Sequence, residues 1–153
     1  MPLQSVLKLI PTARALRVRL SVLNPSNQYE MFPRMSCSWE DNWRCDKPGI
    51  TLAGHACLSN MGKIIILPPR SAHHEAEWWL LFGKLKPGRA TFRLGLVRQR
   101  SDFTSEELEH IYRSGTQNQV FYRSDIGTRF KREQEVFWSN RVVAQLRPEW
   151  LGR

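Results

Sequence analysis

Residues 67–98, LPPRSAHHEAEWWLLFGKLKPGRATFRLGLVR, decide the fold of this chain. Two adjacent prolines interrupt the backbone at the start, and a β-rich run follows in which Trp78, Leu80 and Phe82 share one side. A Lys-Pro-Gly turn at 86–88 then reverses the chain. Apolar side chains at every second position, bounded by proline and glycine, are typical of a β-strand. The first half of the stretch therefore predicts a strand that ends in a turn.

The second half of the stretch alternates in the same way. Phe92, Leu94 and Leu96 are expected to point inward, and Arg93 and Gly95 outward. Together the two halves predict a long hairpin or a corner between two sheets, around which the other strands must be placed.

The remaining sequence contains several more strand patterns. Further strands are expected at residues 14–23, 35–40, 50–52, 63–67 and 134–146. The first of these places Leu16, Val18, Leu20 and Val22 on one face and is expected to pair with the strand at 75–82. Short strands separated by turn residues predict an all-β fold, an immunoglobulin-like antiparallel β-sandwich. Its expected core residues are Leu20, Trp39, Ile65, Trp78, Phe92, Leu94 and Trp138.

Residues 101–133 depart from the strand pattern and are predicted to form an insertion between the last two strands. Thr104 and Glu107 have the spacing of a capping box, and Gly115 is a natural helix end, so one short helix is expected. Long insertions of this kind are usually functional or mobile. The domain plan is a flexible N-terminal arm at 1–13, a single β-sandwich domain at 14–147 and a C-terminal tail at 148–153.

The charge balance favours acidic partners. The chain has 153 residues, with 23 Lys and Arg against 14 Asp and Glu, for a net charge of +9. No apolar run approaches the length of a membrane span. No signal peptide is visible, so the chain as given is expected in the cytoplasm, or outside it if a leader was removed.

One family resemblance follows from the order of the elements. The Leu-Pro-Pro segment at 67–69, the strand with two Trp, the turn at 86–88 and the strand at 90–94 resemble the end of many bacterial immunoglobulin-like domains. The order is most similar to that of the intracellular proteinase inhibitor family, over residues 16–97 with 137–146 as the last strand. The resemblance implies a non-catalytic domain that docks on or inhibits another protein.

The insertion carries the candidate site, because basic side chains alternate there with aromatic ones. The candidate partner-binding residues are Arg113, Tyr122, Arg123, Arg129, Phe130, Lys131 and Arg132. Binding residues tend to lie on loops held by a rigid scaffold, so the insertion is expected to bind an acidic protein partner. The alternative is a nucleic-acid-binding β-domain that uses the same residues. A third possibility is that the insertion covers the outward pair Trp79 and Leu81.

Some of the basic charge has a structural explanation. Arg17 and Arg19 are expected to face Glu75 and Glu77 across two paired strands, since opposite charges on neighbouring strands attract. Similarly, Arg93 and Arg141 are expected to lie near Glu40 on the outer face of the other sheet.

The cysteines and histidines do not indicate catalysis. A disulfide between Cys45 and Cys57 is predicted if the compartment is oxidising, with Cys37 to Cys57 as the rival pairing. No zinc-ligand spacing, phosphate loop or nucleophile motif is present, so no metal site, cofactor or enzyme activity is predicted.

Overall fold

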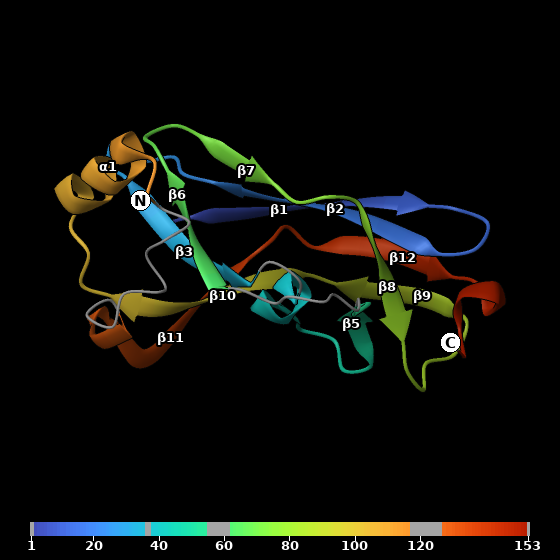
Figure 1. Ribbon diagram of the computed structural model, residues 1–153. Helices are drawn as coiled ribbons and strands as arrows, with labels where there is room; N and C mark the ends of the chain where they lie inside the picture. Colours follow the sequence, from blue (N-terminus) through green and yellow to red (C-terminus); the bar gives the residue numbers. More distant parts are fainter. Residues whose placement is uncertain (1, 36–37, 55–61, 117–126, 153) are drawn as a thin grey trace.

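The computed structural model describes residues 2–35, 38–54, 62–116 and 127–152. These residues form antiparallel strands and one α-helix, which confirms the all-β prediction (Figure 1). In Figure 1 the helix and strand β11 lie at one end of the molecule and the C-terminus at the other.

The largest sheet has the order β1-β2-β8-β5, with β7 also paired to β2. Its strands are β1 (Gln4–Pro11), β2 (Leu16–Leu23), β5 (Ile50–Leu52), β7 (Ala72–His74) and β8 (Trp78–Phe82). The predicted pairing of the strand at 14–23 with the strand at 75–82 is confirmed, since Arg17 lies opposite Trp79 and Val18 opposite Trp78.

The other strands form three smaller antiparallel groups. These are β11 (Phe130–Trp138) with β10 (Leu94–Ser101) and β4 (Trp43–Cys45), β12 (Val142–Leu146) with β9 (Gly88–Phe92), and β3 (Glu30–Met35) with β6 (Gly62–Leu67). The helix is α1 (Ser105–Ser114), and single turns of 3-10 helix lie at η1 (Trp39–Asn42), η3 (Gly127–Arg129) and η4 (Pro148–Trp150).

The main core lies between the inward face of the first sheet and strands β9, β10 and β12. In β2 the alternation is as predicted, because Leu16, Val18, Leu20 and Val22 are buried whereas the residues between them are more exposed. The core residues opposite them come from the second half of the deciding stretch and from β12, and they are Ala90, Phe92, Leu94, Ala144 and Leu146. Burial of these apolar faces is the main driving force for the fold.

The deciding stretch forms a corner and not a hairpin. Strand β8 pairs with β2 and β5, whereas β9 pairs with β12, so the turn at 86–88 carries the chain from one sheet to another group of strands. The second half is also divided at Arg93, where the pairing partner changes from β12 to β11 and β4.

The predicted orientation of Trp138 is wrong. Leu96 is paired with Phe137, and both contribute to a buried cluster, which leaves Trp138 on the opposite face under the guanidinium of Arg93 at 4.6 Å. Gly95 lies beside it, and a Cβ at this position would approach a side-chain carbon of Val136 to 2.5 Å. Glycine is therefore required at position 95, because the side chains of Val136 and Trp138 occupy the space that a Cβ would need.

Three further predicted core residues have mixed outcomes. Trp39 is buried, but it lies in a 3-10 turn and not in the strand predicted at 35–40, of which residues 36 and 37 lie outside the described residues. Ile65 and Trp78 are only partly buried, and each packs against the edge of a core cluster.

Both ends of the chain are more ordered than the domain plan expected. Residues 4–11 form strand β1, which pairs with β2 along its whole length, and Leu7 is buried against the core. At the other end, Trp150 is 4% exposed, stacks on Phe82 and donates a hydrogen bond from its indole nitrogen to the carbonyl of Thr12. An arm and a tail thus complete the core, because each contributes large apolar side chains to it.

A buried carboxylate connects β3 to the loop after β7. The side chain of Glu75 is 2% exposed and accepts hydrogen bonds from Arg34 at 2.8 and 2.9 Å, with His73 at 2.7 Å. Burial alone would raise the pKa of Glu75, but the hydrogen bonds from His73 and Arg34 lower it below the ordinary value. The predicted pairing of Arg17 with Glu75 is therefore wrong, whereas Arg19 does pair with Glu77 at 2.5 Å.

Phe92→Ala is expected to reduce the free energy of unfolding by about 3–5 kcal/mol, because Phe92 is fully buried in the main core and its removal leaves a cavity. Urea unfolding followed by circular dichroism measures the change. Val143→Ala is the control, since Val143 lies on the paired strand β12 and is 53% exposed. Equal losses in the two variants would contradict this account of the core.

Glu75→Ala is expected to cost about 1–3 kcal/mol, since it leaves Arg34 and His73 without their buried partner. Because the folded-state pKa of Glu75 is lowered, its contribution is present above the ordinary pKa of 4.5 and is lost as the pH falls below it. Unfolding curves at neutral and acidic pH test both points. The matched control is Glu77→Ala, where loss of an exposed ion pair should cost less than about 1 kcal/mol.

Candidate partner-binding site

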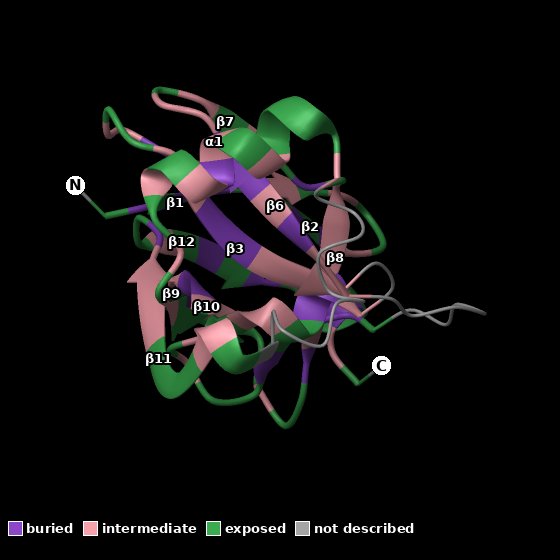
Figure 2. Cartoon of the chain, turned by 60° about the vertical axis from the view of Figure 1, so that its left-hand side comes forward, coloured by how far each residue is buried: buried purple, intermediate pink, exposed green. Residues whose placement is uncertain are grey.

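The helix of the insertion is attached to strands β3 and β6. As predicted, Thr104 and Glu107 form a capping box, and Gly115 ends the helix with a φ of 72°. Leu108 is buried against Met31, Ile64 and Ile66, so α1 lies over β3 and β6 with its outer side exposed (Figure 2).

Arg129 closes the described part of the insertion onto the start of α1. Its guanidinium donates to Glu107 at 2.7 and 2.9 Å, also pairs with Asp102, and lies 4.4 Å from the ring centre of Phe103. The hydrogen bond from Arg129, with a second one from the backbone of Thr104, lowers the pKa of Glu107 to about 2. Arg129 therefore stabilises the insertion.

A second arginine connects three strands beneath the helix. The guanidinium of Arg98 on β10 donates to the Glu30 carboxylate and the Met31 carbonyl on β3, both at 3.0 Å. It also donates to Glu135 on β11 at 2.7 Å and lies 4.8 Å from the ring centre of Phe137. Only 16% of this side chain is exposed, so two carboxylates and one carbonyl compensate a largely buried charge.

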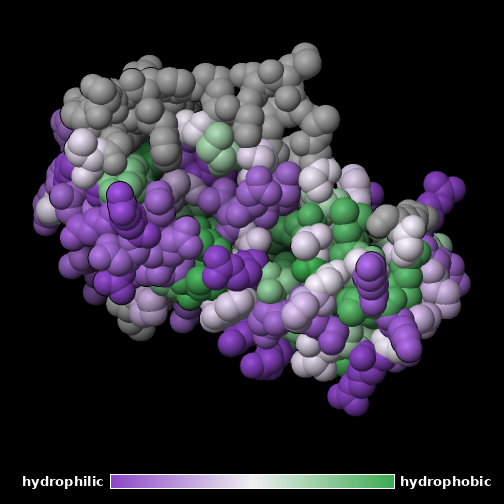
Figure 3. All heavy atoms as spheres, turned by 90° about the horizontal axis from the view of Figure 1, so that it is seen from below, coloured by the Kyte–Doolittle hydropathy of each residue, from purple (hydrophilic) through white to green (hydrophobic). Residues whose placement is uncertain are grey.

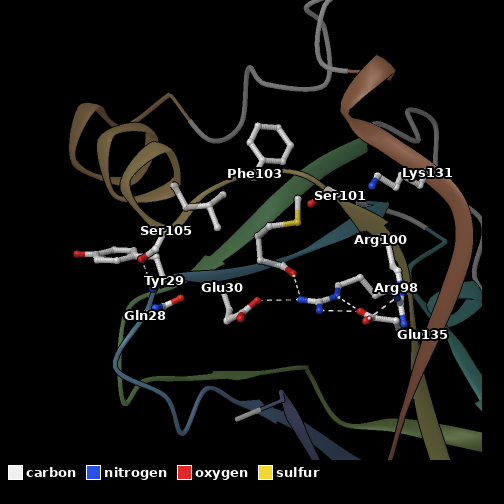
Figure 4. Close-up of a pocket in the computed structure, with 12 residues that line it drawn as sticks. Gln28, Tyr29, Glu30, Arg98, Arg100, Ser101, Phe103, Ser105, Lys131 and Glu135 are labelled. Atoms are coloured by element: carbon white, nitrogen blue, oxygen red, sulfur yellow. Dashed lines mark hydrogen bonds and ion pairs between the residues drawn. The ribbon is translucent and has the colours of Figure 1, made fainter.

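A cavity of about 380 Å³ lies between α1 and β11, and we call it the α1–β11 groove (Figure 4). It is lined by Gln28, Tyr29, Glu30, Met31, Arg98, Arg100, Ser101, Phe103, Ser105, Leu108, Lys131 and Glu135. In Figure 4 Tyr29 and Phe103 lie on the helix side, whereas Arg98, Arg100 and Lys131 lie on the strand side. The volume falls within the range of about 300–1,000 Å³ typical of ligand pockets.

The loop before β3 holds the helix side of the groove in place. Asn24 is fully buried, and its amide nitrogen donates to the carbonyls of Gln28, Leu67 and Pro68 at 2.7, 3.0 and 3.1 Å. The backbone nitrogen of Tyr29 then donates to the hydroxyl of Ser105 at 2.9 Å, which joins this loop to the first turn of α1. The groove is therefore preorganised by hydrogen bonds on its helix side.

The predicted site residues have different environments. Arg113 is exposed on α1 and pairs with Glu109 at 2.7 Å, and Lys131 and Arg132 are exposed on β11. Arg129 is engaged in the ion pairs described above, and Phe130 packs against Phe103 with ring centres 6.0 Å apart. Tyr122 and Arg123 lie outside the described residues.

The insertion is shorter than predicted at its C-terminal end. Strand β11 begins at Phe130, which is paired with Ser101, so residues 130–133 belong to the sheet. Lys131 lines the groove, whereas Arg132 is not one of its lining residues. The predicted basic residues of β11 are therefore divided, with one in the groove and one outside it.

Sequence reasoning missed the groove residues that come from outside the insertion. Tyr29 and Arg100 lie far apart in the sequence, and nothing in their local pattern indicates that they meet. Arg98 and Arg100 were recognisable only as cations beside the insertion.

Two further predictions concern the partners of Arg93 and Arg141 and the surroundings of Trp79. Arg93 and Arg141 approach Asp46 at 3.3 and 3.5 Å and not Glu40 as predicted. Trp79 stacks on Trp78 with Arg17 at 6.0 Å from its ring centre, while α1 packs elsewhere on β3 and β6. The rest of the insertion, residues 117–126, was also predicted as a possible cover for Trp79, and it lies outside the described residues.

Cys45 lies at the edge of the main core, and burial raises the pKa of its thiol. Cys37 and Cys57 lie outside the described residues, so the conditional disulfide stays a prediction.

Within the described ranges, no group of three His, Cys, Asp or Glu side chains is placed to hold a metal ion. No helix in the same part of the chain is long and apolar enough to cross a membrane.

Comparison of the chain with protein-family models, curated proteins and solved structures finds no match. The inference of function therefore depends on the geometry and charge of the groove and its surroundings.

The carboxyl group of Glu107 is expected to titrate with a pKa of about 2 and to move toward its ordinary 4.5 in Arg129→Gln, because that variant removes the main hydrogen-bond donor. A lowered folded-state pKa means that the ion pair stabilises the helix above pH 4.5 and that this contribution is lost as the pH falls toward 2. Carbon-detected NMR measures the titration. Arg132→Gln is the control and should leave it unchanged, and an unshifted Glu107 in Arg129→Gln would contradict the assignment.

Proposed function

We propose that this protein is a non-catalytic, immunoglobulin-like binding domain that docks on or inhibits an acidic protein through the end that carries the insertion. The observation that carries the proposal is the group of exposed cations on α1, β10 and β11, at the end of the molecule that has the groove. This group comprises Arg100, Arg113, Lys131 and Arg132. Acidic surfaces are attracted to such a group, which steers association and favours the correct partner.

The surface charges support this choice of end. Seen from below, the end with α1 and β11 is mostly hydrophilic, whereas the other end has more hydrophobic side chains (Figure 3). The described part of the insertion is held to the scaffold by Leu108 and Arg129, so its outer cations are presented by an ordered element. A rigid presentation lowers the entropic cost of binding.

The immunoglobulin-like assignment has support from the topology. The inward face of β1, β2, β8 and β5 packs against β9, β10 and β12, and the strand at 88–101 changes sheet partner at Arg93. Antiparallel strands that pack in two layers around a shared core are typical of such domains, and the second layer here consists of separate hydrogen-bonded groups. The likeness to intracellular proteinase inhibitors points to protein docking, although fold likeness alone does not transfer a function.

The function is tested by capture from a nuclease-treated lysate of the source organism. The protein and its triple variant R113Q/K131Q/R132Q are immobilised, and captured proteins are quantified by mass spectrometry. We expect the protein to capture acidic proteins and the variant to capture roughly tenfold less of them, since three attractive charges are lost.

The matched control is K84Q/K86Q/R89Q, which removes the same charge from exposed residues beyond β8, at the other end of the molecule. This control should retain the captured proteins. Equal losses in both triple variants would refute a specific site. Binding to a single-stranded oligonucleotide that weakens steeply with salt, without captured protein, would instead favour the nucleic-acid alternative.

A further inference from the structure

The α1–β11 groove combines an apolar wall with a cationic one. Tyr29 and Phe103, which are both partly exposed, supply aromatic surface on the helix side, and the ring of Tyr29 lies 5.9 Å from that of Tyr112. On the strand side, Arg100 is 60% exposed and Lys131 is exposed. The groove thus presents two kinds of surface within the length of a short peptide.

The cationic wall has one positive charge in surplus. Arg98 is compensated by Glu30 and Glu135 at 3.0 and 2.7 Å, and Arg100 shares Glu135 at 3.3 Å. Lys131 forms no ion pair with any residue that the structure describes. One incoming carboxylate would therefore balance the charge of the groove.

The same charges disfavour a nucleic acid in this position. A single strand carries a phosphate at every nucleotide, and the carboxylates of Glu30 and Glu135 line the groove beside the cations. Repeated phosphates along the groove would approach these carboxylates, whereas a single acidic side chain needs only Arg100 and Lys131. Charge complementarity thus selects a peptide with an isolated carboxylate.

We infer that the α1–β11 groove binds a segment of a protein partner in which a Glu or Asp lies next to a large apolar residue. The carboxylate lies between Arg100 and Lys131, where both donate charge-assisted hydrogen bonds. The apolar side chain lies against the rings of Tyr29 and Phe103, where it loses contact with water. This inference rests on the proposed function and specifies the chemistry of the partner.

The probe is the synthetic peptide acetyl-Gly-Phe-Glu-Gly-amide, compared with acetyl-Gly-Phe-Gln-Gly-amide. Each is titrated into the full chain labelled with nitrogen-15, and amide shifts are followed by NMR. We expect shifts at groove residues and a dissociation constant roughly tenfold lower for the Glu peptide, since hydrogen bonds to a charged group are stronger than those to a neutral one.

Two variants test the assignment of the cationic wall. R100Q/K131Q should raise the dissociation constant of the Glu peptide to that of the Gln peptide while leaving the Gln peptide unchanged. The matched control K84Q/K86Q removes the same number of exposed cations at the other end of the molecule and should change neither. Well-dispersed amide spectra of each variant verify that the fold is retained.

Several outcomes overturn the inference. These are equal affinities of the two peptides, shifts confined to residues outside the groove, or the same loss in K84Q/K86Q as in R100Q/K131Q. An oligonucleotide that shifts the groove amides at lower concentration than the Glu peptide also overturns it.

The peptide and lysate experiments fail independently. If R113Q/K131Q/R132Q loses the captured proteins but the peptides show no preference, the proposed function stands and the groove assignment falls. If the peptides behave as expected but the lysate capture is insensitive to the triple variant, the groove chemistry stands and the proposed docking surface falls.

Discussion

The burial of one positive charge, that of Arg98, determines how two groups of strands meet. Its guanidinium donates to Glu30 and the Met31 carbonyl on β3 and to Glu135 on β11. A largely buried charge is tolerated only with close partners and satisfied hydrogen bonds. Since β3 and β10 belong to different hydrogen-bonded groups, this side chain supplies cross-links that a backbone ladder would otherwise provide. The strands must therefore meet at this side chain, and it forms the floor of the groove.

The ion pairs of Arg98 also affect which charges of the groove are available to a partner. Because Arg98 engages both nearby carboxylates, the cations at the rim of the groove retain capacity for an external acid. The insertion supplies the second wall, held in place by Leu108 in an apolar cluster and by Arg129 across the start of the helix. Arg98 and Arg129, which are engaged in ion pairs, thus hold the walls of the groove in place, whereas the exposed cations at the rim are available to bind. This division separates Arg129 from Lys131, although only one residue lies between them in the sequence.

The local pattern predicted a large part of the fold and a smaller part of the site. The alternation in β2, the strand at 50–52 and the capped helix are all present, because each depends on side chains close together in the sequence. The faces of Phe137 and Trp138 were assigned the wrong way round, since an unbroken run of large apolar residues fits either parity of a strand. The ends of the chain were also misjudged, because Trp150 finds its apolar partner, Phe82, only after folding.

The sequence by itself determined the all-β class, the helix with its cap, the strands and turn within residues 67–98 and the excess of positive charge. These features follow from periodicity, turn residues and composition, all of which act over a few neighbouring residues. Only the tertiary structure decided which arginines are buried in ion pairs and which are exposed, and that Tyr29 and Arg100 share a groove with Lys131. The physical reason is that the partners of a long charged side chain are set by strand pairing between distant segments.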